Sequence, residues 1–169
     1  MLGAGILKSD DRVELIDGEI VEKMPPTNPH TACIAALHLL LVRRCGERAL
    51  VRSSGAVKIP RWSAPEPDLV LLRWRDDFYR NVDTAAADVF LAVDVAHTSL
   101  RYDRTVKMRL YAEAGIREYW VVDLDGDAVD VYRLPSPAGY RVVRRITRDQ
   151  LVAPEAFPDV VLSLPDFLG

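Results

Sequence analysis

The chain has 169 residues, of which 49% are hydrophobic and 28% are charged, and its formal net charge is −3. This length suits one domain around a single core, and no apolar run approaches the ~20 residues that would span a membrane. The net charge excludes a general nucleic-acid coat protein but allows a local basic surface. We therefore expect residues 1–169 to form one soluble domain.

The first predicted elements are a β-hairpin and a helix. Residues 12–22 carry the Asp17-Gly18 dipeptide, which is typical of a two-residue hairpin turn. Asn28-Pro29 then combines a good N-cap residue with proline at the first helical position. Apolar residues recur at helical spacing as far as Cys45, and Gly46 is a suitable residue to end the helix.

The cellular location is indicated by the cysteines and the N-terminus. Cys33 and Cys45 fall on the same predicted helix, where their separation corresponds to ~18 Å along the helix axis. A disulfide cannot bridge that distance, so we expect two reduced thiols. The N-terminus also lacks the basic region of a secretory signal. Both observations favour a cytoplasmic location.

The remaining sequence predicts six strands and a second helix. The strands are expected at residues 49–59, 68–72, 89–96, 118–123, 128–132 and 140–146. The helix is expected from about Tyr102 to Ala114, with Val106, Leu110 and Ala114 on its inner face. We expect the C-terminal tail, including Phe167, to pack over the sheet edge. This order of elements predicts an α/β fold with a central mixed sheet flanked by helices.

Two acidic residues lie within or beside apolar strand segments. Asp94 interrupts the run Val89–Ala96, and Asp68 stands at the start of the segment that follows Pro67. Burying a bare carboxylate costs several kcal/mol or more unless it is paired, protonated or bound to a metal. A strand-closing role for Asp94 and a turn role for Asp68 are the ordinary alternatives. Together the two acids favour a cation site.

Phosphodiester hydrolysis would use such a site together with a nearby lysine. Mg²⁺ prefers oxygen ligands and keeps several waters, so Asp68, Asp94 and the carbonyl of Val95 could hold it. Lys107, on the following predicted helix, could orient the attacking water and help to deprotonate it. Taken alone, Lys107 is more often a solvated residue, or an i,i+4 partner of Asp103.

An ordered set of short motifs carries a family resemblance. Besides Pro67-Asp68, Asp94-Val95-Ala96 and Lys107, the landmarks are Glu14 to Glu19, Pro25-Pro26 with His30, Thr98 to Arg104, Leu110 to Gly115 and Glu118 to Asp123. The set resembles the PD-(D/E)XK nuclease superfamily, and within it the Uma-type branch of restriction endonucleases. The resemblance implies a restriction-endonuclease-like core with an N-terminal hairpin.

The same resemblance implies a hydrolase that cleaves DNA with Mg²⁺, for which Mn²⁺ could substitute. It adds Glu14 to the catalytic set of Asp68, Asp94 and Lys107. His30 lies near the start of the first helix and could reach the metal site or a phosphate. Because cutting both strands usually needs two active sites, a homodimer is the expected assembly.

Residues 97–104 offer further substrate contacts. His97 borders the expected site in sequence, where it either contacts substrate or fills a loop. Arg101 and Arg104 could meet phosphate beside the cation, although basic runs are usually solvated faces. Relatives often have Asp at position 97. That difference and the net charge suggest an alternative, a catalytically weakened nuclease fold that acts as a DNA- or protein-binding module.

Overall fold

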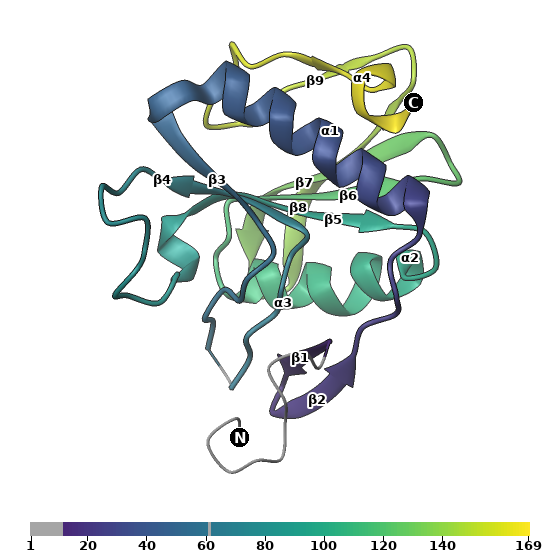
Figure 1. Cartoon of the computed structure of the whole chain (residues 1–169). Coiled ribbons are helices and arrows are strands. Elements are labelled where there is room, and N and C mark those ends of the chain that lie inside the picture. Colours follow the sequence, from purple (N-terminus) through teal and green to yellow (C-terminus); the bar gives the residue numbers. More distant parts are fainter. Residues whose placement is uncertain (1–11, 61) are drawn as a thin grey trace.

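A six-stranded mixed sheet forms the centre of the protein (Figure 1). The computed structural model describes residues 12–60 and 62–169. The strands lie in the order β3 (Ala49–Ser53), β4 (Leu69–Arg73), β5 (Val89–Ala96), β6 (Glu118–Asp123), β7 (Ala128–Ser136) and β8 (Gly139–Thr147). Strands β5 and β6 are parallel, and the other neighbouring pairs are antiparallel. The predicted α/β fold with a mixed sheet is confirmed.

The two faces of the sheet are buried under different elements. Helix α1 (Asn28–Cys45) covers one face, and the α2–α3 region covers the other (Figure 1). Along β5, Leu91, Val93 and Val95 join the core beneath α1, whereas Ala92 and Ala96 join the core on the α3 side. This alternation follows from the two-residue period of a strand. It also sends Asp94 toward the α3 side, and burial on both faces explains the continuous apolar run.

Helix α1 buries one stripe against the sheet. Its buried residues are Cys33, Leu37, Leu41 and Cys45, which recur every fourth position and so lie on one side of the helix. Both cysteines are free thiols, as the sequence predicts. Within residues 12–60 and 62–169, no helix is both long enough and apolar enough to cross a membrane.

The C-terminal tail packs with α1 rather than over the sheet edge, so that expectation was wrong. Its elements are β9 (Leu151–Val152), β10 (Leu162–Ser163) and the short helix α4 (Pro165–Leu168). Val160, Leu162 and Phe167 belong to the same buried core as α1 and β5. Burial of these apolar side chains in the core shared with α1 and β5 stabilises this position of the tail.

The second helix also differs from the prediction. It consists of α2 (Leu100–Tyr102), a π-helical turn (Asp103–Lys107) and α3 (Met108–Glu113). The wider π turn changes which side chains face inward. Leu110 is buried, and Val106 and Ala114 pack partly against the same core, as expected. Lys107 and Asp103 are buried as well, which the apolar spacing did not predict. This helical crossover joins the parallel strands β5 and β6.

The N-terminal hairpin forms a separate two-stranded sheet beside the α3 face (Figure 1). Strands β1 (Val13–Ile16) and β2 (Glu19–Glu22) meet at Asp17 and Gly18, whose φ values are 49° and 82°. The predicted Asp-Gly turn is therefore confirmed. A backbone hydrogen bond of 2.8 Å from Ala64 to Leu15 fixes the hairpin to the segment before β4. Single 3-10 turns occur at Gly46–Arg48 and Ala86–Asp88.

Candidate active site

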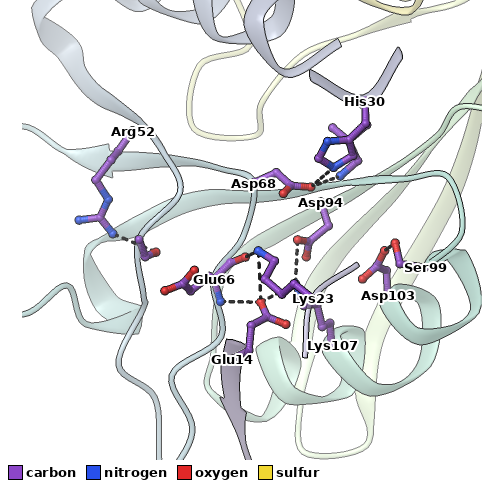
Figure 2. Close-up of polar contacts among 12 residues, drawn as sticks. Glu14, Lys23, His30, Arg52, Glu66, Asp68, Asp94, Ser99, Asp103 and Lys107 are labelled. Atoms are coloured by element: carbon purple, nitrogen blue, oxygen red, sulfur yellow. Dashed lines mark hydrogen bonds and ion pairs between the residues drawn. The ribbon is translucent and has the colours of Figure 1, made fainter. Parts of the chain in front are cut away.

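A cavity of about 280 Å³ lies between the hairpin side and the start of α2. One wall is formed by the end of β2 and the segment 23–27 that connects it to α1, and another is formed by residues between 97 and 103. Besides the exposed Glu22, four buried or half-buried acidic side chains and one buried lysine border it, namely Glu14, Asp68, Asp94, Asp103 and Lys107. The cavity therefore collects charged groups from four separate parts of the chain (Figure 2).

Asp68 and Asp94 are brought together by the antiparallel pairing of β4 and β5. Leu69 pairs with Val93, so the next residues outward, Asp68 and Asp94, lie opposite each other. Directly opposed residues of an antiparallel pair point to the same face of the sheet, with Cβ atoms roughly 4.5–5.5 Å apart. Strand register thus places both carboxylates at one end of the cavity.

Asp94 is almost fully enclosed, with 3% of its surface exposed. Lys107 Nζ donates to its Oδ1 at 2.9 Å, and the Tyr119 hydroxyl donates to its Oδ2 at 2.9 Å. Burial raises the pKa of the Asp94 carboxyl, while the positive charge of Lys107 opposes that change. Both oxygens are therefore fixed in direction by donors from the helix and the next strand.

Lys107 is the central cation of the site. Its Nζ lies 2.9 Å from Asp94 Oδ1 and 2.9 Å from Glu14 Oε1. Burial alone would lower the pKa of the Lys107 ammonium, but the charges of Asp94 and Glu14 outweigh it and hold this pKa well above its usual value. Lys107 is consequently a positively charged donor in this arrangement, and its part in deprotonating the attacking water stays a prediction.

Asp68 is tied to both α1 and β5. Its Oδ2 accepts the Val95 backbone N–H at 2.8 Å and lies 3.2 Å from His30 Nε2 (Figure 2). Burial would raise the pKa of Asp68, but the hydrogen bonds from His30 and Val95 prevail and hold it below its usual range. An ionised carboxylate only accepts hydrogen bonds, so His30 carries its proton on Nε2 in this arrangement.

Glu14 joins the site from the hairpin. Its Oε1 accepts the Glu66 backbone N–H at 2.7 Å and pairs with Lys107. Lys23 lies close by, where its Nζ donates to the Glu66 carbonyl at 2.9 Å and stands 3.8 Å from Glu14 Oε1 (Figure 2). Glu14 thereby links the hairpin, the Asp68 segment and the π turn.

Asp103 is a fourth acid whose part in the site the sequence reasoning missed. It is 2% exposed, and its Oδ2 accepts the Ser99 hydroxyl at 2.6 Å. Burial, reinforced by the charge of Asp94, raises the pKa of Asp103 to about 7. The spacing of four residues between Asp103 and Lys107 places both on one side of a helix, but from the sequence alone it is interpreted only as an ion pair. The contacts of Lys23 and Tyr119 were also missed, because no local pattern in the sequence indicates them.

The expected substrate-contacting residues divide into two groups. His30 and His97 line the cavity, and His97 Nε2 also lies 3.4 Å from Asp125 Oδ1. Arg101 is exposed on α2 and lies outside the cavity lining. Arg104 also lies outside it, because its guanidinium bonds Asp130 Oδ2 at 2.7 Å and Asp123 Oδ2 at 3.1 Å.

The oxygen donors at the end of β5 fit a hard divalent cation. Carboxylates of Asp68 and Asp94 and the carbonyl of Val95 are the ligand types that Mg²⁺ prefers, with waters completing its shell. The hydrogen bonds found to the Asp68 carboxylate from the described residues all use Oδ2, which leaves Oδ1 open. Among the same residues, no group of three or more His, Cys, Asp or Glu side chains forms a metal cage.

Comparisons with known proteins agree with the fold. The Uma2 family model, described as "Putative restriction endonuclease", matches residues 4–165. The structure of a putative nuclease belonging to DUF820 from Anabaena variabilis ATCC 29413 matches at 17% identity with a TM-score of 0.78, covering 98% of this chain and 94% of that one. The type IIG restriction endonuclease BpuSI matches at 18% identity with a TM-score of 0.47, covering 89% of this chain and 17% of that one. No curated protein sequence matches the chain significantly.

Proposed function

Because the chain belongs to the Uma2 family of putative restriction endonucleases, we propose that it is a divalent-metal-dependent endonuclease that hydrolyses DNA phosphodiester bonds. The observation that carries this proposal is the opposed pair Asp68 and Asp94, with Lys107 held between Asp94 and Glu14 in one cavity. Mg²⁺ or Mn²⁺ at this place would supply Lewis-acid activation of a water and of the phosphate.

The side chains of the site have distinct tasks in this proposal. Asp68 and Asp94, with the carbonyl of Val95, hold the cation. Lys107 donates a hydrogen bond to the attacking water and places its positive charge beside the charge that develops on the phosphate. Glu14 fixes the direction of the Lys107 ammonium through its 2.9 Å contact. His30 contacts the substrate phosphate through Nδ1, which has no partner among the described residues and must carry a proton to donate to phosphate while Nε2 donates to Asp68.

The same proposal extends to the substrate, the assembly and the location of the protein. We propose that DNA is the substrate and that two copies form a cytoplasmic homodimer when both strands are cut. His97 lines the cavity and is a second candidate for substrate contact. Arg104 is not part of this proposal, because Asp123 and Asp130 already bind its guanidinium.

Asp68→Asn and Asp94→Asn test the metal assignment. Each change removes a carboxylate charge with little change in side-chain volume, so nicking of supercoiled plasmid in Mg²⁺ or Mn²⁺ should fall at least about a hundredfold. Circular dichroism checks that the variants fold. The matched control is Asp166→Asn, which changes an exposed carboxylate on α4 and should retain the wild-type rate.

Two results would contradict these assignments. A wild-type rate in either site variant would reject the metal ligands. A wild-type protein that binds DNA and cuts none in Mg²⁺ or Mn²⁺ would instead favour a nuclease-fold binding module.

A further inference from the structure

The cavity has an apolar wall beside its acidic floor. Met24, Pro25 and Pro26 line it from the segment between β2 and α1, while Asp68 and Asp94 lie at the ends of buried strands. Met24 is 71% exposed, although long apolar side chains are usually covered. A phosphate alone would not need such a wall. The wall fits a ligand that has an apolar surface joined to a phosphate.

Three residues that line the cavity each carry a buried polar atom that lacks a partner among the described residues. These atoms are Thr27 Oγ1, His30 Nδ1 and the Tyr102 hydroxyl, and each is buried within the protein. Leaving a buried polar group unpaired costs about 1–3 kcal/mol, so such groups are normally satisfied. Thr27 and His30 stand on the α1 side, whereas Tyr102 stands on the α2 side. Hydrogen-bonding groups therefore flank the apolar wall from two directions.

The size of the cavity limits what can enter it. Its volume of about 280 Å³ is close to the lower end of small-molecule sites, which are roughly 300–1,000 Å³. That space admits one group of nucleotide size. In a duplex, each base is stacked and paired, so it cannot leave the helix without an unstacking cost of a few kcal/mol. A single strand presents its bases and backbone without that cost.

We propose that the cavity binds one unpaired nucleotide beside the scissile phosphate, so that the substrate class is single-stranded DNA or an unpaired segment of DNA. This inference rests on the proposed nuclease function. The base lies against Met24, Pro25 and Pro26, as apolar and aromatic surfaces accept any base by its flat face. The hydroxyl groups of Tyr102 and Thr27 bond the polar edge of the nucleotide.

Binding in the absence of metal tests this inference apart from cleavage. The anisotropy of a fluorescein-labelled single-stranded oligonucleotide is measured in EDTA and compared with that of its duplex. We expect the single strand to bind at least about tenfold more tightly. Tyr102→Phe removes only the unpartnered hydroxyl and should weaken single-strand binding about twofold to tenfold. Met24→Ala should weaken it by a similar factor.

Ile20→Ala is the matched control for Met24→Ala. Ile20 is another exposed apolar residue of the hairpin region, 43% exposed, and it lies outside the cavity lining. Its substitution should leave binding unchanged. Equal or tighter binding of duplex, or unchanged binding in both cavity variants, would overturn the inference.

Cleavage assays separate this inference from the proposed function. If the protein cuts duplex DNA in the presence of metal at least as fast as it cuts single strands, the binding of an unpaired nucleotide is rejected. The proposed nuclease function is then still supported. If the protein binds single strands but cuts no DNA in Mg²⁺ or Mn²⁺, the single-strand binding site is supported and the proposed nuclease function is rejected.

Discussion

Single residues determine how this site responds to pH, and Asp103 is the clearest case. Its pKa is about 7 in the folded protein, compared with about 3.9 for an unperturbed aspartate. The folded state therefore holds this proton more tightly than the unfolded state. The contribution of Asp103 to the free energy of unfolding is largest at low pH and falls between about pH 4 and pH 7, by about 1.4 kcal/mol per pH unit.

Asp103→Asn should remove this dependence, because the amide does not titrate. As the pH rises from 5 to 7, the free energy of unfolding of the variant should increase relative to that of the wild type. This difference should stay constant above pH 7. Urea unfolding at several pH values in EDTA measures it. Asp166→Asn, at an exposed position, should follow the wild-type profile. Parallel profiles for Asp103→Asn and the wild type would contradict the raised pKa.

Some of the individual residues of the site could be predicted from the sequence. Asp68 and Asp94 were recognisable because an acid in an apolar segment is costly unless it has a partner. The structure places Lys107 between Asp94 and Glu14, although the roles of Lys107 and Glu14 remain predictions. Tyr119 could not be identified in this way, because its contact with Asp94 depends on the pairing of β5 with β6. Lys23 likewise reaches Glu66 only once the hairpin has docked.

Individual elements were predictable where local pattern determines them. The Asp17-Gly18 turn and helix α1 follow from turn and capping preferences, and both occur. The π turn at Asp103–Lys107 did not follow from the apolar spacing. It is favoured by tertiary contacts, since it directs Lys107 to Asp94 and Glu14, and periodicity does not contain that information.

The docking of the C-terminal tail on α1 can be tested through Phe167. Only 3% of this side chain is exposed, and it belongs to the core beneath α1. Phe167→Ala should lower the free energy of unfolding by about 3–5 kcal/mol because it leaves a cavity in that core. Leu151→Ala, at a position of the same tail that is 64% exposed, should change it by less than about 0.5 kcal/mol. Equal losses in urea unfolding would mean that Phe167 is not buried.

On the scale of the whole molecule, we propose that the chain behaves as one domain. Strands β4, β5 and β6 send alternate residues into the two core clusters, so neither cluster can be lost while the other keeps its strands. Urea unfolding should therefore show one cooperative transition. Trp120 contributes to the tryptophan fluorescence from the α1 side, and Tyr111 and Tyr119 contribute to the near-ultraviolet circular dichroism from the α3 side. Different midpoints for the two signals would indicate independent units.

The hairpin stands apart from the main sheet, and this has a consequence for how the protein opens. The floor of the cavity belongs to β5, a central strand that is hydrogen-bonded on both sides. The wall beside it begins at β2, in a sheet of two strands. Local opening is easiest where few strands pair, and central strands open only with the whole fold. We therefore expect the wall to open more readily than β5, so that access to the cavity and the placement of Asp94 depend on parts of different stability.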